Sequence, residues 1–312
     1  MARPLVRVAA VQVEPAFLDL EGCLARLEEW TRKAAAEGAT LVAFGETWLP
    51  GYPEWVDASP EAAIWGHPGA RALHARLMEN SVVVPGAATL RMGAVARELS
   101  VTLVVGVNER RGKTIYNALL TFGPDGALLN HHRKLVPTFN ERLVWGYGDG
   151  HGLRAVTVNG VRMGGLICWE HFMPLARQAM HDTGEEVHVA AWPGVSEMHQ
   201  IASRHYAFEG RCFFVAAGGI LSVGQMPPEL PPLARHREEP SGLILRGGSA
   251  VIAPDGRYLA GPVFDREAVV VADCDLAEIA MGAQTLDVSG HYSRPDVLQL
   301  KVVESPARLT DQ

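Results

Sequence analysis

Residues 161–181 read VRMGGLICWEHFMPLARQAMH, and this stretch decides the fold class. Val161 to Ile167 is a mostly apolar run that predicts a strand, and Pro174 to His181 has the apolar spacing of a helix. Between them the pattern changes abruptly at Cys168-Trp169-Glu170-His171. The alternation continues with a strand at Val187 to Ala191, a helix at Glu197 to Glu209 and a strand at Cys212 to Ala217. Strands that alternate with helices are typical of sheets covered by helices, so we predict an α/β fold.

The same pattern extends toward both ends of the chain. Strands are predicted at Leu5 to Val13, Leu41 to Phe44, Thr102 to Val107 and Leu153 to Val158, and helices at Leu20 to Gly38, Glu61 to Met78 and Ala87 to Leu99. Two Pro-Asp-Gly turns, at 124–126 and 254–256, each join a pair of apolar runs and predict β-hairpins. Met226 to Pro240 is rich in proline and charge, which favours a surface excursion or a subunit contact. We predict one domain with two layered sheets.

Composition narrows the class of function. The chain has 312 residues, 48% of them hydrophobic, and 35 acidic against 28 basic residues give a net charge of −7. Without a dense basic cluster, a nucleic acid is not expected as a partner. We expect no signal peptide and no membrane span, since no apolar run approaches roughly 20 residues. The four cysteines, which form no CxxC pair, favour a reducing cytoplasm over a disulfide framework.

Cys168 is the first candidate for chemistry. A side chain at a strand-to-helix turn points out at the edge of the sheet, where the following N–H groups and the helix N-terminus favour a thiolate and an oxyanion. A buried, inert cysteine is the alternative, and the spacing alone favours it. A cysteine nucleophile also needs a base, because only a few per cent of a free thiol is ionised at neutral pH.

Three further residues are candidates for assisting such a thiol. Glu46 follows the apolar strand Leu41 to Phe44, at a sheet edge where open α/β folds place their sites. Lys134 lies in an unusually apolar context, in which a lysine either extends its amine to solvent or is paired. Glu141 is close enough in sequence to be that partner, with a surface ion pair as the alternative. The alternative for Glu46 is an ordinary solvated acid in a loop.

Five segments together resemble the nitrilase branch of the carbon-nitrogen hydrolase superfamily, in the family's order and over nearly the whole chain. The segment 44–53 is similar to the family's general-base motif, 132–138 is similar to its lysine motif, and 165–175 is similar to its nucleophile motif, that is, Phe44 to Pro53, His132 to Thr138 and Gly165 to Leu175. Glu141 to Gly150 is similar to the stretch with a second glutamate, and Asp287 to Val297 is similar to the C-terminal motif. The Cys-Trp-Glu form at 168–170 is the most discriminating of these, because it resembles true nitrilases and cyanide-hydrolysing relatives.

The resemblance implies a fold, an assembly and a site. It implies an αββα sandwich formed by a single domain over 1–312, whose C-terminal extension, 287–312, takes part in subunit contacts, and a homodimer or higher homo-oligomer. It implies catalytic roles for Glu46, Lys134, Cys168 and Glu141. As substrate-binding walls we predict Tyr52, Thr138, Trp169 and Trp192, with core packing as the alternative for the aromatic residues. No cofactor and no metal are expected, since His131-His132 and Cys168 to His171 lack HExxH or paired-cysteine spacing.

The implied activity is hydrolysis of an organic nitrile to a carboxylic acid and ammonia. An amidase or carbamoylase would use the same Glu-Lys-Cys set, and cyanide itself remains open as the substrate. A protein that kept the fold as an inactive scaffold is the alternative from a different class. Preference among aliphatic, aromatic and arylacetonitrile substrates stays open, because a methylene in an apolar pocket changes discrimination by only about 1 to 3 kcal/mol.

Overall fold

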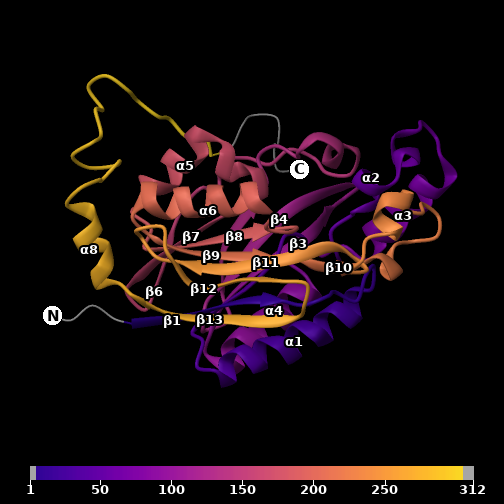
Figure 1. Ribbon diagram of the computed structural model, residues 1–312, viewed down its shortest axis with the longest axis horizontal. Coiled ribbons are helices and arrows are strands. Elements are labelled where there is room, and N and C mark those ends of the chain that lie inside the picture. The colour runs from indigo at the N-terminus through magenta and orange to yellow at the C-terminus, as the bar shows by residue number, and fades with distance from the viewer. Residues whose placement is uncertain (1–4, 305–312) are drawn as a thin grey trace.

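The computed structural model of the protein describes residues 5–304, and two sheets packed face to face form its centre (Figure 1). The first sheet has the strand order β13-β1-β2-β3-β4-β5. Its parallel centre, β1 to β3, is flanked by antiparallel neighbours on both sides. The strands are β1 (Leu5–Gln12), β2 (Leu41–Phe44), β3 (Thr102–Arg111), β4 (Thr114–Phe122), β5 (Leu128–Arg133) and β13 (Ala268–Asp275).

The second sheet has the order β10-β11-β9-β8-β7-β6, with β12 paired to β11. Strands β7, β8 and β9 run parallel, and the remaining pairs are antiparallel. The strands are β6 (Val156–Val158), β7 (Val161–Ile167), β8 (Val187–Trp192), β9 (Phe213–Gly218), β10 (Ile220–Ser222), β11 (Leu243–Ile252) and β12 (Tyr258–Phe264). Strands β8 and β9 are buried along their whole length, as expected where one face meets the other sheet and one face meets helices.

Helices cover the outer face of each sheet (Figure 1). Helices α1 (Leu20–Ala36) and α4 (Ala87–Leu99) lie on the first sheet, and α5 (Pro174–His181) and α6 (Glu197–Gly210) lie on the second. Apolar side chains fill the space between the sheets and the space beneath the helices. The predicted αββα sandwich and the two predicted hairpins, β4–β5 and β11–β12, are therefore confirmed. Within residues 5–304, no helix is long and apolar enough to cross a membrane.

The remaining helical elements lie in the segments that connect or follow the strands. They are α2 (Trp55–Ala58), η1 (Pro60–Ala63), α3 (Pro68–Glu79), η2 (Phe139–Leu143), η3 (Cys168–Phe172), η4 (Val223–Gln225), α7 (Ala234–Arg237) and α8 (Ala277–Ala283). The prediction of one helix from Glu61 to Met78 is wrong, because a non-helical segment separates η1 from α3. Gly66 adopts a left-handed φ of 76° there, and Pro68, which lacks an N–H, begins a new helix.

Two other predictions need correction. The strand predicted at Leu153 to Val158 begins only at Val156. The segment Met226 to Pro240 is not wholly a surface excursion, since Leu230 is buried. Ser59 Oγ donates hydrogen bonds to the carbonyls of Leu230 and Pro231, which ties this segment to the end of α2. Apolar spacing cannot reveal that attachment, because it is made by backbone carbonyl groups.

Candidate active site

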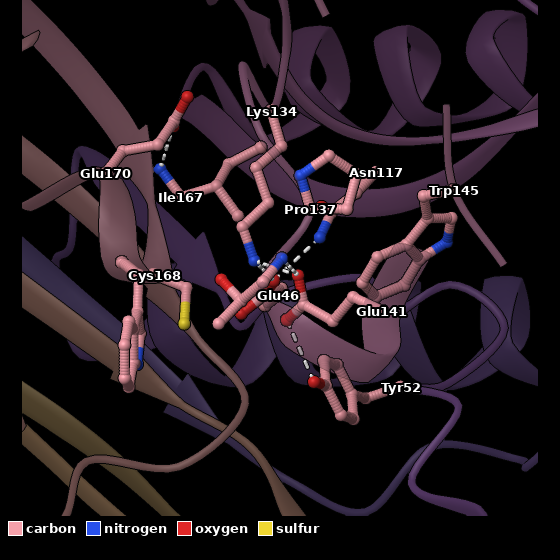
Figure 2. Close-up of polar contacts among 12 residues, drawn as sticks. Glu46, Tyr52, Asn117, Lys134, Pro137, Glu141, Trp145, Ile167, Cys168 and Glu170 are labelled. Carbon is pink, nitrogen blue, oxygen red and sulfur yellow. Dashed lines mark hydrogen bonds and ion pairs between the residues drawn. The ribbon is translucent and has the colours of Figure 1, made fainter. Parts of the chain in front are cut away.

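Four predicted site residues come together where the two sheets meet (Figure 2). Glu46 follows β2 by two residues, and Lys134 directly follows β5, both in the first sheet. Cys168 directly follows β7 of the second sheet, and Glu141 lies in η2. Figure 2 shows the Cys168 sulfur and the Lys134 amine directed toward Glu46. The site therefore exists only when both sheets are assembled.

The backbone at Cys168 makes an abrupt turn. Its φ is 49°, in the left-handed region that a residue with a β-carbon seldom adopts, and η3 begins at the same residue. The Cys168 carbonyl accepts a hydrogen bond of 2.6 Å from His171 Nδ1, which supports this conformation. Left-handed backbone at a non-glycine residue is often found at functional sites. Here it turns the thiol away from the strand and into the cavity beside it.

Lys134 lies between two carboxylates. Its Nζ donates to Glu46 Oε1 at 2.8 Å and to Glu141 Oε2 at 2.6 Å, and all three side chains are buried. Tyr52 donates its hydroxyl to Glu141 Oε1 at 2.9 Å. The pairing of Lys134 with Glu141 that the sequence suggested is thus a buried contact and not a surface ion pair. Buried charges of this kind hold a fixed geometry because each has a strong partner.

Glu46 is held so that one of its oxygens remains free. Asn117 Nδ2 donates to Glu46 Oε1 at 2.6 Å, the same oxygen that Lys134 contacts. Glu46 Oε2 has no hydrogen-bond donor within residues 5–304. A carboxylate oxygen of Glu46, one of Glu141 and the Cys168 sulfur all lie within 4.8 Å of one another. The free oxygen is therefore available to take a proton from the thiol.

The three atoms of that cluster would also suit a metal ion by distance alone. The charge of the site argues for a different organisation. The ammonium of Lys134 already contacts both carboxylates, so it takes the place that a cation would occupy between them. The arrangement is suited to moving a proton near one sulfur.

Burial sets the protonation states of these groups. Burial raises the pKa of Glu46 to about 7, an effect that Lys134 opposes and Glu141 strengthens. Burial, then the neighbouring Glu46, raises the pKa of Cys168 well above its ordinary value. Burial alone lowers the pKa of Lys134, but Glu46, Cys168 and Glu141 raise it overall. The resting site therefore holds a neutral thiol, an ammonium and a carboxylate that titrates near neutral pH.

Glu170, which the sequence analysis did not select, ties the two sheets together beside the site. Its carboxylate accepts hydrogen bonds from the backbone N–H of Leu135 at 2.8 Å and of Ile167 at 2.7 Å. It also contacts His132 Nε2 at 2.9 Å. Leu135 follows Lys134 and Ile167 precedes Cys168, so one buried carboxylate fixes the spacing of both residues. Asn117 was missed as well, although an asparagine inside the apolar run 114–122 is a signal that such a strand carries a buried polar contact.

A cavity of about 350 Å³ opens beside Cys168. Three of the predicted substrate-binding residues line it, namely Tyr52, Thr138 and Trp169. Trp192 does not: it is fully buried and packs against His171, Phe172 and His199. Its carbonyl oxygen accepts a hydrogen bond from the Glu46 N–H at 3.1 Å. Trp192 therefore supports the backbone of Glu46 from the facing sheet and is not a wall of the cavity.

Comparison with known proteins identifies the family. The sequence profile of the carbon-nitrogen hydrolase family matches residues 7–284, which include all four clustered residues. The chain belongs to the carbon-nitrogen hydrolase family. Within it, the chain lies in the nitrilase branch, because a nitrilase of Paraburkholderia phymatum is 38% identical over 97% of this chain and 88% of its own length. An aliphatic nitrilase of Sinorhizobium fredii is 37% identical over 96% of both chains.

A solved structure agrees on the fold of this carbon-nitrogen hydrolase. The carbon-nitrogen hydrolase of Helicobacter pylori superposes with a TM-score of 0.68 over 90% of this chain and 92% of its own, at 18% identity. Such distant similarity shows the fold alone. The family assignment therefore rests on the sequence relatives, and the chemistry on the cluster around Cys168.

Proposed function

We propose that this chain is a nitrilase, which converts an organic nitrile and two waters to a carboxylic acid and ammonia. The observation that carries the proposal is the buried Glu46-Lys134-Glu141 cluster at the thiol of Cys168. The relatives at 37% and 38% identity that are called nitrilases support the choice of substrate class. We assign catalytic roles to these four residues.

The first step joins the substrate to the protein. Glu46 takes the proton of the Cys168 thiol while the sulfur attacks the nitrile carbon, and Glu46 then passes this proton to the nitrile nitrogen, which gives a covalent thioimidate. Because the pKa of Cys168 lies well above its ordinary value, the thiol stays neutral until an electrophile is present. Proton transfer and attack then occur together. This order protects a buried sulfur from carrying an isolated charge.

The remaining steps release both products. A water adds to the thioimidate carbon, and the tetrahedral species expels its nitrogen as ammonia, which leaves a thioester. A second water, deprotonated by Glu46, attacks the thioester carbon and releases the carboxylic acid, and the proton returns to the sulfur. Lys134 and the backbone N–H of Trp169 stabilise negative charge on the tetrahedral species. Glu141, held by Tyr52, orients Lys134.

Replacement of the nucleophile tests this proposal. Cys168→Ala is expected to lower ammonia release from a panel of aliphatic and arylaliphatic nitriles by at least about 10³-fold, since the covalent route is lost. Amides matched to each nitrile serve as the comparison, because an amidase would release ammonia faster from the amide. Turnover that survives in Cys168→Ala, or activity on the amides alone, would contradict the assignment.

We also propose that the chain forms a homodimer through the outer face of α5 and α6. Large apolar side chains are exposed there, namely Leu175, Met198, Ile201 and Phe208, and a monomer seldom leaves such a group in water. Residues 287–304 follow α8 without a regular helix or strand, and Ser289 contacts Asp182 at the end of α5, so this segment would join the same contact. Residues 305–312 of the predicted extension lie outside the described residues.

Two further proposals concern the whole chain. We treat residues 1–312 as one carbon-nitrogen hydrolase domain, supported by the profile match over 7–284 and by the continuous core between the sheets. We place the protein in the cytoplasm, a location supported by four buried cysteines that are all free thiols.

A further inference from the structure

One carboxyl group in the cavity beside Cys168 has no partner. Glu54, at the start of α2, lines this cavity and is only 9% exposed. No donor within residues 5–304 forms a hydrogen bond or ion pair with its side chain. Buried polar groups almost always have such partners, because the loss of water is otherwise uncompensated. The Glu54 carboxyl is not fully enclosed by protein, so it opens onto the cavity, where a ligand with a hydrogen-bond donor can reach it.

The other buried glutamates show how unusual this is. Glu109 accepts from Arg133 and His131, Glu170 from two backbone N–H groups, and Glu185 from Tyr206. Glu46 and Glu141 share Lys134. Each of these carboxylates accepts at least one hydrogen bond from the protein itself. Among the buried glutamates of residues 5–304, Glu54 differs in having no such donor, and it lines the cavity beside Cys168.

The charge of the cavity indicates what this ligand is. Asp57, one helical turn after Glu54, also lines the cavity, and only one of its oxygens is engaged, by Asn140 Nδ2 at 3.0 Å. The one basic side chain in the lining is His199, and burial lowers its pKa, so it is uncharged near neutral pH. Lys134 is already bound to Glu46 and Glu141. This part of the cavity therefore presents two carboxyl groups, those of Glu54 and Asp57, without a cationic side chain to match them.

We propose that Glu54, with Asp57 beside it, is a subsite for a protonated amine carried by the substrate at the end remote from its nitrile. The inference rests on the proposed nitrilase function and names the kind of nitrile. The ammonium donates to Glu54 and is attracted by Asp57, while the nitrile carbon lies at Cys168. A cavity of about 350 Å³ suits a small molecule of this kind.

The raised pKa of Glu54 is compatible with binding of a cation. Burial, with a smaller contribution from Asp57, raises the pKa of Glu54 to about 8. The empty cavity thus holds a neutral acid near pH 7, which avoids an isolated buried charge. A bound ammonium would favour the ionised form and lower that pKa, so the pair forms only when the cation arrives.

Four nitriles test the proposal: 4-aminobutanenitrile, pentanenitrile and 4-hydroxybutanenitrile, which have the same chain length, and 4-cyanobutanoate, which carries a carboxylate where the first carries its amine. At pH 7.5 we expect kcat/KM to be highest for the amine and lowest for the carboxylate. In Glu54→Gln, the ratio of kcat/KM for 4-aminobutanenitrile to that for pentanenitrile should fall by about tenfold to a hundredfold, mainly through KM, since a charged hydrogen bond is lost. Asp57→Asn should lower the ratio less. Glu61→Gln, an exposed acid on η1 outside the cavity, is the matched control and should leave the ratio unchanged.

Several results would overturn the inference. The inference fails if the ratio is unchanged in Glu54→Gln. It also fails if the unmodified protein prefers pentanenitrile or 4-cyanobutanoate, or if kcat/KM is equal for the hydroxyl and amine compounds. If none of the four nitriles is hydrolysed, the nitrilase proposal fails in this panel, and binding then tests the subsite by itself. Ligand-observed NMR on Cys168→Ala protein should show tighter binding of 4-aminobutanenitrile than of pentanenitrile, and Cys168→Ala/Glu54→Gln should lose that difference.

Discussion

At the scale of single residues, the proposed base must take a proton and yet remain inside the protein. Glu46 meets both needs because Lys134 and Asn117 occupy one carboxylate oxygen and leave the other free. Burial raises the pKa of Glu46 to about 7, so at neutral pH about half of the groups are ionised. An ordinary glutamate, with a pKa near 4.3, would be a much weaker base toward a thiol.

The pH dependence of the reaction follows from that value. The base must be ionised, so kcat/KM should rise with pH and level off above about pH 7, where Glu46 has lost its proton. Glu46→Gln should lower kcat by about 10² to 10⁴-fold and remove this rise, while the fold persists. A pH series of kcat/KM on both proteins, with circular dichroism as the check on folding, makes the comparison. A variant with a normal pH profile would remove Glu46 from the role of base.

At the scale of elements, the sheets position the site through close backbone contacts. Gly106 in β3 lies directly beneath the loop that carries Glu46. A β-carbon at this position would lie 2.2 Å from the Gly45 carbonyl oxygen and 2.6 Å from the Thr47 nitrogen. These neighbours are backbone atoms, which cannot move aside without moving Glu46. The absence of a side chain at Gly106 thus determines how closely the Glu46 loop can approach β3.

Gly106→Ala should therefore affect both activity and stability. We expect a loss of about 1 to 3 kcal/mol in the free energy of unfolding, because of overpacking, and a fall in kcat of about 10²-fold from the displaced carboxylate. Chemical denaturation and steady-state kinetics measure the two effects. The matched control is Gly224→Ala, since a β-carbon there would meet nothing within 4 Å. Equal behaviour of the two variants would show that the close contact at Gly106 has no consequence.

At the scale of the whole molecule, the two helical layers differ in what they leave exposed. On α6, Ile201 is 51% exposed and Met198 is 59% exposed, and on α5, Leu175 is 69% exposed. These side chains belong to α5 and α6, the helices on the outer face of the second sheet (Figure 1). Assembly through this face would bury them and hold η3 and α5 in place. The proposed dimer would thus support the site from outside.

A charge placed on this face tests the assembly. Ile201→Glu should convert the dimer to a monomer, because a carboxylate would be buried against its own copy across a two-fold interface. Light scattering coupled to size exclusion gives the mass directly. Leu90→Glu on α4, where the leucine is 75% exposed on the opposite side of the molecule, is the control and should leave the mass unchanged. An unmodified protein that is already monomeric would contradict the proposal.

Much of this molecule follows from its sequence. The strands β2 and β7 and the helices α4 and α5 occur at the predicted residues, because a period of two or of 3.6 in apolar side chains acts over short distances along the chain. The sequence also predicts the candidate residues Glu46, Lys134, Cys168 and Glu141, since each belongs to a local motif.

Only the tertiary structure decided which groups are paired and which are not. Trp192 faces the core rather than the cavity, Asn117 and Glu170 join segments far apart in the chain, and Glu54 is left without a donor. Pairing and burial are properties of residues brought together from different elements, and the pKa values of Glu46 and Glu54 depend on both. The sequence specifies which residues are present. Their desolvation, which shifts these pKa values, occurs only when the two sheets pack against each other.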